Sequence, residues 1–309
     1  MDAQLLEQSL AGSAIKVPAS ADIIAVRQFS LDEMQSRARH LLSTIAEVSE
    51  DGCVSDRGDW PSGDAETTIE LAQGARAVLY HASGAVQYFS ALTPLQALFK
   101  RVEDKEVLVR QVQEAARKLN IAEWAGEQGS IEFERLFQMK AQGADKGGRA
   151  SDVVLARAVG AYRHFVAGIP VLGAASVALR LAGNGAVDTL SLQVRPSAGE
   201  RIDTAKIIAP ELAARQLAQQ LVSLLGAGRE PLPGDAIESS VLHFGYLDLG
   251  KRKAQQLLAP AFVAQVVLRH KLEKQAYVLA VPATEKTYQP IFSRGDDGLA
   301  TGVRGNRCK

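Results

Sequence analysis

The sequence lacks most of the features by which a function is usually recognised. It has two cysteines, Cys53 in a Gly/Asp-rich loop and Cys308 beside the C-terminus, and this pair does not have the spacing of a zinc site. At most one disulfide can form, so neither a reducing nor an oxidising compartment is excluded. No run of about 18 apolar residues is present to span a bilayer. The first residues, with Asp2 and Glu7, do not resemble a signal peptide.

The chain also lacks an excess of charge of either sign. Lys and Arg together number 35, as do Asp and Glu, so the formal net charge at pH 7 is zero. Without a basic stripe interleaved with aromatic residues, the chain is not expected to bind nucleic acid. Nucleophile elbows, phosphate loops and dinucleotide fingerprints are absent too. What is present is ordinary globular composition, 47% apolar over 309 residues, which predicts two or three modest domains with buried cores.

Three amphipathic helices are predicted from apolar residues at helical spacing. The first begins with a capping box, Ser30 to Glu33, whose side chains satisfy each other's backbone amides. The third begins at Pro210, which suits a first helical turn, and ends at Gly226. The predicted apolar faces are Leu31, Met34, Ala38, Leu41 and Ile45 in the first helix, Leu108, Val112, Ala115 and Leu119 in the second, and Ala213, Leu217, Leu221 and Leu224 in the third.

Antiparallel strands are predicted in the intervals between these helices. The dipeptides Ser83-Gly84 and Asn184-Gly185 indicate hairpin turns, because tight hairpins require positive φ angles. In residues 131–140 apolar and polar residues alternate, which predicts one buried and one wet face. The apolar members of that alternation are Ile131, Phe133, Phe137 and Met139. The expected strands are residues 75–80, 85–92, 131–140, 153–166, 174–181, 186–194, 239–249, 260–270 and 276–281.

The order of a helix followed by antiparallel strands occurs three times. It predicts an α+β fold of tandem modules, each with one helix packed on a curled antiparallel sheet. The expected division is an N-terminal module (1–100), a central module (101–200), a C-terminal module (201–292) and a flexible tail (293–309). The Gly-rich stretch 143–151 is expected to link two strands of one sheet rather than two domains.

The most distinctive stretch is YRHFVAGIPVLG, from Tyr162 to Gly173. Pro170 cannot donate to a strand ladder, and Gly168 and Gly173 permit backbone angles that other residues avoid. We therefore expect a structural bend at Gly168, Pro170 and Gly173, which turns or bulges the chain between two paired strands. Tyr162 and Phe165 are expected to lie along one side of it.

Together with the following VALRL strand and Gly-Asn-Gly turn, this stretch resembles the PepSY/FTP-like domains. These occur in propeptides of thermolysin-type metalloproteases and in extracytoplasmic regulators of the YycH and YycI kind. The later order of helix, strand, Leu-Ala-Pro-Ala-Phe-Val segment and closing strand is similar, so the resemblance covers residues 104–282. The chain departs from the family in having no downstream metalloprotease with His-Glu-x-x-His and no N-terminal transmembrane helix.

The resemblance implies that the central and C-terminal modules are PepSY-like and that the protein is a free-standing regulator or inhibitor. The leading interpretation is a non-enzymatic protein that binds a protein or peptide through sheet faces or edges. It would lie outside the cytoplasm if a leader or anchor had been removed. The alternative is an enzyme or small-molecule-binding protein with a pocket between sheet and helix.

Six residues are the candidates for a binding role under these interpretations: Tyr162, Arg163, His164, Arg180, His243 and Tyr246. No catalytic residue, cofactor or metal is assigned, because the five histidines have no metal-ligand spacing. The loop with Asp56, Asp59 and Asp64 lacks the order of a calcium loop and is expected to be a hydrated loop.

Four arginines on predicted strands of one sheet have two possible readings. If strand pairing brings Arg157, Arg163, Arg180 and Arg195 together, they form a cationic patch for a carboxylate or an acidic peptide. In the other reading they belong to an exposed face whose charge is balanced by acidic residues. The acidic residues in question are Glu132 and Glu134.

Overall fold

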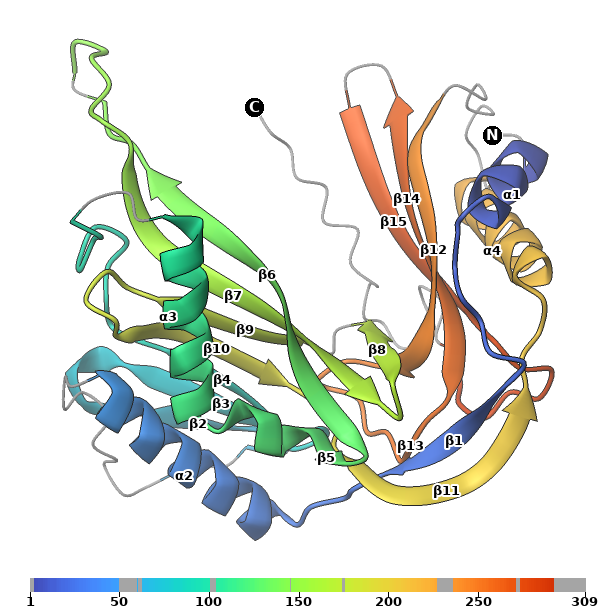
Figure 1. The fold of residues 1–309 in the computed structure, drawn as a ribbon, viewed down its shortest axis with the longest axis horizontal. Coiled ribbons are helices and arrows are strands. Elements are labelled where there is room, and N and C mark those ends of the chain that lie inside the picture. Colours follow the sequence, from blue (N-terminus) through green and yellow to red (C-terminus); the bar gives the residue numbers. More distant parts are fainter. Residues whose placement is uncertain are drawn as a thin grey trace. The chain divides into compact units, whose positions relative to one another are not determined.

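The computed structural model describes residues 3–49, 60, 63–100, 104–144, 146–173, 176–226, 236–270 and 273–291 (Figure 1). The chain forms two compact units. The central unit consists of residues 26–199 and 248–256, and the terminal unit of residues 1–25, 200–247 and 257–309. No helix in the described ranges is long and apolar enough to cross a membrane.

The central unit contains two long helices and a large sheet. Its helices are α2 (Leu31–Ser49), α3 (Lys105–Lys118) and the short 3-10 helices η1 (Ala72–Gly74) and η2 (Ile121–Ala125). Its strands are β2 (Glu66–Glu70), β3 (Arg76–Tyr80), β4 (Ala85–Phe89), β5 (Gly126–Glu127), β6 (Gly129–Ala141), β7 (Val154–Val166), β8 (Ile169–Gly173), β9 (Ser176–Leu181) and β10 (Val187–Gln193).

The terminal unit contains the remaining two helices. They are α1 (Ala3–Ala11) and α4 (Pro210–Gly226). Its strands are β1 (Ser20–Val26), β12 (Ile237–Asp248), β13 (Leu257–Leu258), β14 (Pro260–His270) and β15 (Glu273–Pro282). Strand β11 (Ser197–Lys206) begins in the central unit and ends in the terminal unit.

The three predicted helices are present, and their ends follow the predicted signals. The Ser30 amide donates to the Glu33 carboxylate at 2.8 Å, and the Glu33 amide donates to the Ser30 hydroxyl at 3.3 Å, which confirms the capping box. In α4 the prediction for Leu224 is wrong, since its side chain is 44% exposed. The buried stripe of α4 continues from Leu221 at the next i+4 position, the partly buried Leu225.

The central sheet has the order β6-β7-β9-β10-β4-β3-β2, with antiparallel neighbours throughout. Figure 1 shows α2 and α3 on the same face of it. One row of covered residues crosses the whole sheet: Ile69, Ala77, Tyr88, Leu190, Leu179, Gly160 and Leu136. A Cβ atom on Gly160 would lie 2.1 Å from Cγ1 of Val112 in α3. A glycine is therefore needed where α3 approaches β7 most closely.

The bend after Tyr162 is a tight hairpin between β7 and β8. Val166 pairs with Ile169, and the two residues between them, Ala167 and Gly168, have φ angles of 49° and 76°. Positive φ at both central positions is the geometry of a type I′ turn. Gly173, at the end of β8, also has a positive φ of 91°.

One part of the expectation for this bend is wrong. Tyr162 is buried beneath α3, whereas Phe165 is only partly buried. The register with β6 is regular from residue 162 to residue 165. Side chains three residues apart on a regular strand point to opposite faces, so Tyr162 and Phe165 do not lie along one side.

The terminal sheet pairs β12, β14 and β15 antiparallel, and α4 packs against β14 and β15. The buried residues Leu242, Ala264 and Leu279 form one row across these three strands. On the other face, Val241 is 43% exposed and Val278 is 66% exposed. This unit therefore also has one covered and one open face. Both units together give the expected α+β class with mainly antiparallel sheets.

The two units do not follow the expected consecutive boundaries. Strand β4, expected in module 1–100, pairs with β10, expected in module 101–200. Strands that pair in a sheet can lie far apart in the sequence. Boundaries taken from the order of elements along the chain therefore need not match those of the folded units. That the chain is built of tandem modules stays a prediction.

Several other predictions can be compared with the described ranges only in part. The stretch 143–151 links β6 and β7 of one sheet, as expected. Helix α1 and strands β1, β2 and β11 were not predicted. The tail 293–309, both cysteines, Asp56 and Asp59 lie outside the described residues.

Candidate functional site

Among the described residues, no helix covers the face of the central sheet opposite α2 and α3, and we call this face the open face. Two rows of side chains cross it from β2 to β6, and each member is partly or fully exposed. The rows are Thr68, Val78, Gln87, Ser191, Ala178, Ala161 and Arg135, and then Glu70, Arg76, Phe89, Thr189, Arg180, Val159 and Phe137. The open face thus mixes apolar, hydroxyl and charged side chains.

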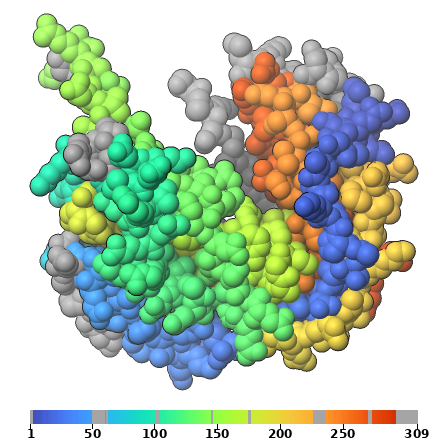
Figure 2. All heavy atoms as spheres, in the orientation of Figure 1, coloured from blue at the N-terminus to red at the C-terminus, as the bar shows by residue number. Residues whose placement is uncertain are grey.

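Strand β6 forms one edge of this sheet. Within the described ranges it pairs with β7 and with no other strand. None of its 13 residues is buried. Its outer edge therefore presents backbone amides and carbonyls that no neighbouring strand in the described sheet satisfies. Figure 2 shows the end of the β6–β7 hairpin standing out from the rest of the central unit.

A bulge in β6 changes which of its side chains reach the open face. The register with β7 shifts between Phe133 and Arg135, so Glu134 is an extra residue. Phe133 packs edge-on against Tyr162 on the covered face, with ring centroids 5.5 Å apart. After the bulge the alternation is reversed, so Phe137 is 49% exposed and Met139 is 40% exposed. The prediction that Phe137 and Met139 share the buried face with Phe133 is wrong for this reason.

Glu134 is the centre of a charge cluster on β6 and β7. One Arg163 guanidinium nitrogen donates to both carboxylate oxygens of Glu134, at 2.8 and 2.9 Å. Arg135 donates to the same carboxylate at 2.7 Å. The hydrogen bond from Arg163 is the largest cause that holds the pKa of Glu134 below its usual range. Glu134 is therefore ionised at neutral pH, and Arg163 is a paired cation.

The predicted cationic patch does not form, because buried carboxylates hold its other members. Arg157 Nε lies 3.1 Å from Asp188, and both side chains are almost fully buried. Arg180 lies 3.6 Å from the same carboxylate, at the open face. Arg195, expected on a strand, lies between β10 and β11, and its Nε is 3.3 Å from Asp248. Arg157 and Arg195 therefore belong neither to a cationic patch nor to an exposed face, so both predicted interpretations are wrong for these two residues.

Arg195 also anchors a segment of chain against the central sheet. Its guanidinium donates to the carbonyls of Gly250 at 2.8 Å and Lys253 at 2.6 Å. In the same segment, Lys251 Nζ donates to Gln87 at 2.8 Å. Burial raises the pKa of Asp248, and the charge of Arg195 opposes that shift. Residues 248–256 thus cover part of the open face near β3 and β4.

Tyr162 and His164 lie on the covered face of β7. The Tyr162 hydroxyl donates to the Val112 carbonyl of α3 at 3.0 Å, and burial raises the pKa of this phenol. His164 is fully buried, and burial lowers its pKa to about 4. The backbone of Ala125 opposes this shift, but neither ring nitrogen has a partner in hydrogen-bonding geometry among the described residues. His164 is therefore neutral at pH 7 and does not face a ligand.

His243 and Tyr246 belong to the terminal unit, on β12. The Tyr246 hydroxyl donates to the Asp22 carbonyl of β1 at 2.9 Å. Burial raises the pKa of Tyr246 to about 12. His243 is partly buried. Of the six candidates, Arg163 and Arg180 lie on the open face, while Tyr162, His164 and Tyr246 are structural core residues.

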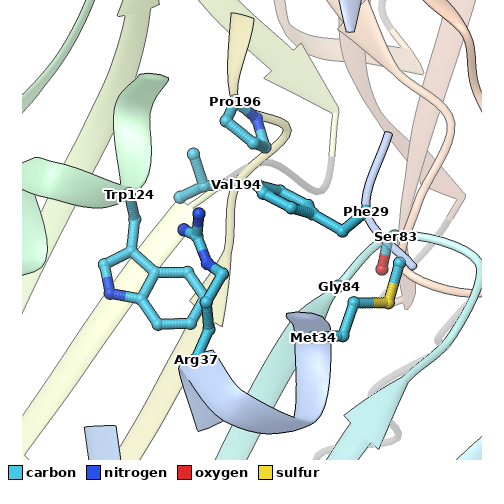
Figure 3. Close-up of a pocket in the computed structure, with 8 residues that line it drawn as sticks. All are labelled: Phe29, Met34, Arg37, Ser83, Gly84, Trp124, Val194 and Pro196. Carbon is cyan, nitrogen blue, oxygen red and sulfur yellow. The ribbon is translucent and has the colours of Figure 1, made fainter. Parts of the chain in front are cut away.

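Two cavities are described in the central unit, and neither contains any of the six candidates. One, of about 10 Å³, is lined by Phe29, Met34, Arg37, Ser83, Gly84, Trp124, Val194 and Pro196 (Figure 3). It is barely large enough for one water molecule. The other, of about 450 Å³, is an open hollow along the exposed side of α3, lined by Lys105, Glu106, Val109 and Arg110. Among the described residues, no group of three His, Cys, Asp or Glu side chains is arranged to hold a metal ion.

Comparison with known proteins yields a similarity of fold. No protein-family profile and no curated protein matches the chain. The fold is similar to the crystal structure of an uncharacterized protein from Eubacterium rectale, with a TM-score of 0.53 and 10% sequence identity. The similarity covers 89% of this chain and 86% of the other.

Proposed function

We propose that this protein is a non-enzymatic binding protein that takes an extended segment of a partner protein along β6 and the adjoining open face. The observation that carries the proposal is β6 itself, a 13-residue edge strand without a buried residue. Backbone groups on such an edge bind an extended peptide, and alternate side chains set its specificity. The exposed side chains of Phe137 and Met139 supply apolar contact beside that edge.

A chain segment already bound to the open face supports this reading. Residues 248–256 lie against β2 and β3. Lys251 Nζ is 4.3 Å from the centroid of the Tyr80 ring on β3, and Arg252 forms an ion pair of 3.3 Å with Glu66 on β2. Polar anchors and aromatic rings of the open face therefore suit an external polypeptide as well.

The length of the partner segment follows from the two register shifts between β6 and β7. The extra residue is Glu134 of β6 at the first shift, and it is Ala156 of β7 at the second, between Met139 and Lys140. Bulges and charged residues discourage unspecific edge pairing. The five residues from Arg135 to Met139 form the regular stretch between these shifts, so the partner strand pairs along Arg135–Met139.

The two units are, in this proposal, modules of the PepSY/FTP-like kind with a regulatory or inhibitory role. The support is their common plan, in which helices cover one face of an antiparallel sheet and the other face is open. Tandem modules of this plan leave sheet faces and edges free for a partner.

The test combines capture of a partner with a map of where it binds. Wild-type protein is used as bait in the native lysate, and a partner identified by mass spectrometry is then purified and titrated back. Amide hydrogen exchange in the complex should slow in β6 from Arg135 to Met139, because edge pairing protects main-chain amides. Phe137→Asp with Met139→Asp should weaken binding by at least about tenfold, roughly the loss of 1.4 kcal/mol.

The matched control is Leu95→Asp, an exposed leucine of the same unit that belongs neither to β6 nor to the two rows of the open face. It should bind the partner like the wild type. Equal binding by the β6 double variant, or protection elsewhere than β6, would overturn edge addition. Recovery of no partner above background, with turnover of a small molecule instead, would favour an enzyme.

A further inference from the structure

Arg37 of α2 lies between two aromatic rings at the small cavity of the central unit (Figure 3). Its guanidinium carbon is 4.4 Å from the ring centroid of Phe29 and 4.4 Å from that of Trp124. A second guanidinium, that of Arg27, lies 4.9 Å from the Phe29 ring. The aromatic faces stabilise both cations.

The donors of these two guanidinium groups are unused within the described residues. Neither Arg27 nor Arg37 has a side-chain hydrogen bond or an ion pair there. An arginine presents five N–H donors in the plane of its guanidinium. The Phe29 and Trp124 side chains carry no conventional hydrogen-bond acceptor, so the N–H donors of Arg37 are left free to bind one.

The nearby carboxylates do not supply that acceptor. Glu33 accepts hydrogen bonds from the amide and hydroxyl of Ser30 at the start of α2. Glu123, next to Trp124, acts on Arg37 electrostatically but is not within ion-pair distance in the structure. Partial burial and the charge of Arg27 lower the pKa of Arg37, which is the direction expected for a cation without a partner.

We propose that Arg37, with Arg27 beside it, binds the carboxylate group of a ligand. A planar carboxylate matches the fork of donors on the guanidinium edge and forms two parallel hydrogen bonds there. The cavity of about 10 Å³ has room for only about one water molecule, so the carboxylate binds at the partly exposed Arg37 guanidinium rather than inside the cavity. The carboxylate belongs either to a small free acid or to an acidic side chain on a polypeptide.

The test uses the indole N–H of Trp124 as a reporter in proton–nitrogen NMR spectra of the whole chain. The protein has two tryptophans, so Trp60→Phe assigns the signal. Sodium acetate and the neutral-ended dipeptide analogue acetyl-glutamate amide are titrated against sodium chloride at equal ionic strength. We expect a saturable shift with both carboxylates and none with chloride.

Two variants separate a carboxylate site from general charge attraction. Arg37→Lys keeps the charge but removes the fork, and it should weaken carboxylate binding by about tenfold. Arg37→Gln should abolish binding, which keeps the test decisive if the lysine variant is unstable. The matched control is Arg76→Lys, an exposed arginine over a single ring, Phe89, at 5.2 Å. It should leave the titration unchanged.

The outcomes also identify the source of the carboxylate. Tighter binding of acetyl-glutamate amide than of acetate indicates an acidic side chain, and equal binding indicates a small free acid. A wild-type response to chloride equal to that to acetate, or full binding by Arg37→Gln, overturns the proposal. So does a wild-type protein that fails to respond while Glu123→Gln responds, because Arg37 would then be paired internally.

Discussion

The central and terminal units follow the same plan but place their charges differently. In both, a row of buried residues faces helices, an opposite row is exposed, and a buried tyrosine joins the sheet to a neighbouring element. The central unit buries two pairs of opposite charge, Arg157 with Asp188 and Arg195 with Asp248. In the terminal unit the ion pairs of the described residues lie at the surface.

This difference determines how strongly the stability of each unit depends on its charged residues. A buried ion pair adds little net stability over apolar residues of the same volume, but removing one partner leaves an uncompensated charge in the interior. An exposed ion pair is screened by water and contributes little. The central unit should therefore be far more sensitive than the terminal unit to loss of charge and to acid.

The largest effect is expected from Asp188→Asn in the central unit. It leaves Arg157, whose side chain is 3% exposed, without a carboxylate. The asparagine keeps an oxygen that accepts from the Ser90 hydroxyl, 2.9 Å from Asp188, so the change removes the charge and retains this hydrogen bond. We expect a loss of about 3 to 5 kcal/mol in the free energy of unfolding, measured by urea titration.

The matched change in the terminal unit is Glu7→Gln. It breaks the pair between Glu7 and Arg215, whose Nε is 3.3 Å from the carboxylate and whose side chain is 60% exposed. The free energy of unfolding should change by less than about 1 kcal/mol. Similar losses for the two variants would show that burial of charge does not distinguish the units.

The next largest effect concerns acid and His164. Its pKa is lowered from 6.5 to about 4 by burial, so the unfolded chain binds this proton more readily than the folded chain. The folded state then loses stability as the pH falls from about 6.5 to about 4, and below that range the loss is constant at roughly 3 kcal/mol.

His164→Gln isolates this contribution from that of other groups. The pH dependence of the variant's free energy of unfolding comes from the remaining titratable groups. The difference in this free energy between the wild type and the variant should therefore fall across the same pH range by the amount expected for His164. Hydrogen exchange should place the acid-induced loss in the central unit. A pH-independent difference between the two proteins would contradict a neutral, buried His164.

A smaller, paired effect is expected from the two buried tyrosines. Tyr162→Phe removes the donor to the Val112 carbonyl in the central unit, and Tyr246→Phe removes the donor to the Asp22 carbonyl in the terminal unit. Each change should cost about 1 kcal/mol, the net contribution of one hydrogen bond. Hydrogen exchange should show faster opening in the unit that carries the change. Uniform acceleration in both would mean that the units unfold as one.

The local parts of the fold could be predicted from the sequence because short-range chemistry determines them. Ser30 and Glu33 cap α2, and Gly168 has the positive φ angle that its hairpin requires. The roles of Tyr162 and Tyr246 could not be predicted, since a phenol on a strand suits a ligand and a backbone carbonyl of a distant element equally well.

The site on β6 could not be predicted because of a single extra residue. Alternation places Phe133 and Phe137 on the same face of a regular strand, but the bulge at Glu134 puts Phe137 on the other face. Nothing in the alternating pattern marks Glu134 as the extra residue, since the bulge depends on pairing with β7. Likewise, Asp188 is remote in sequence from Arg157, so their burial as a pair follows only from the packing of the strands.

The smallest effect is expected on the two open faces. Phe137→Thr in the central unit and Val278→Thr in the terminal unit replace exposed residues by one that also favours strands. Each should change the free energy of unfolding by less than about 1 kcal/mol, because both residues are already about half exposed to water or more. Leu279→Thr is the buried control on the same strand as Val278, and it should destabilise the protein clearly more. If Phe137→Thr were as costly as the buried control, Phe137 would be a core residue, and its exposure could no longer be an argument for a partner at β6. A small effect on stability combined with weaker partner binding would instead separate the role of this side chain in binding from any role in folding.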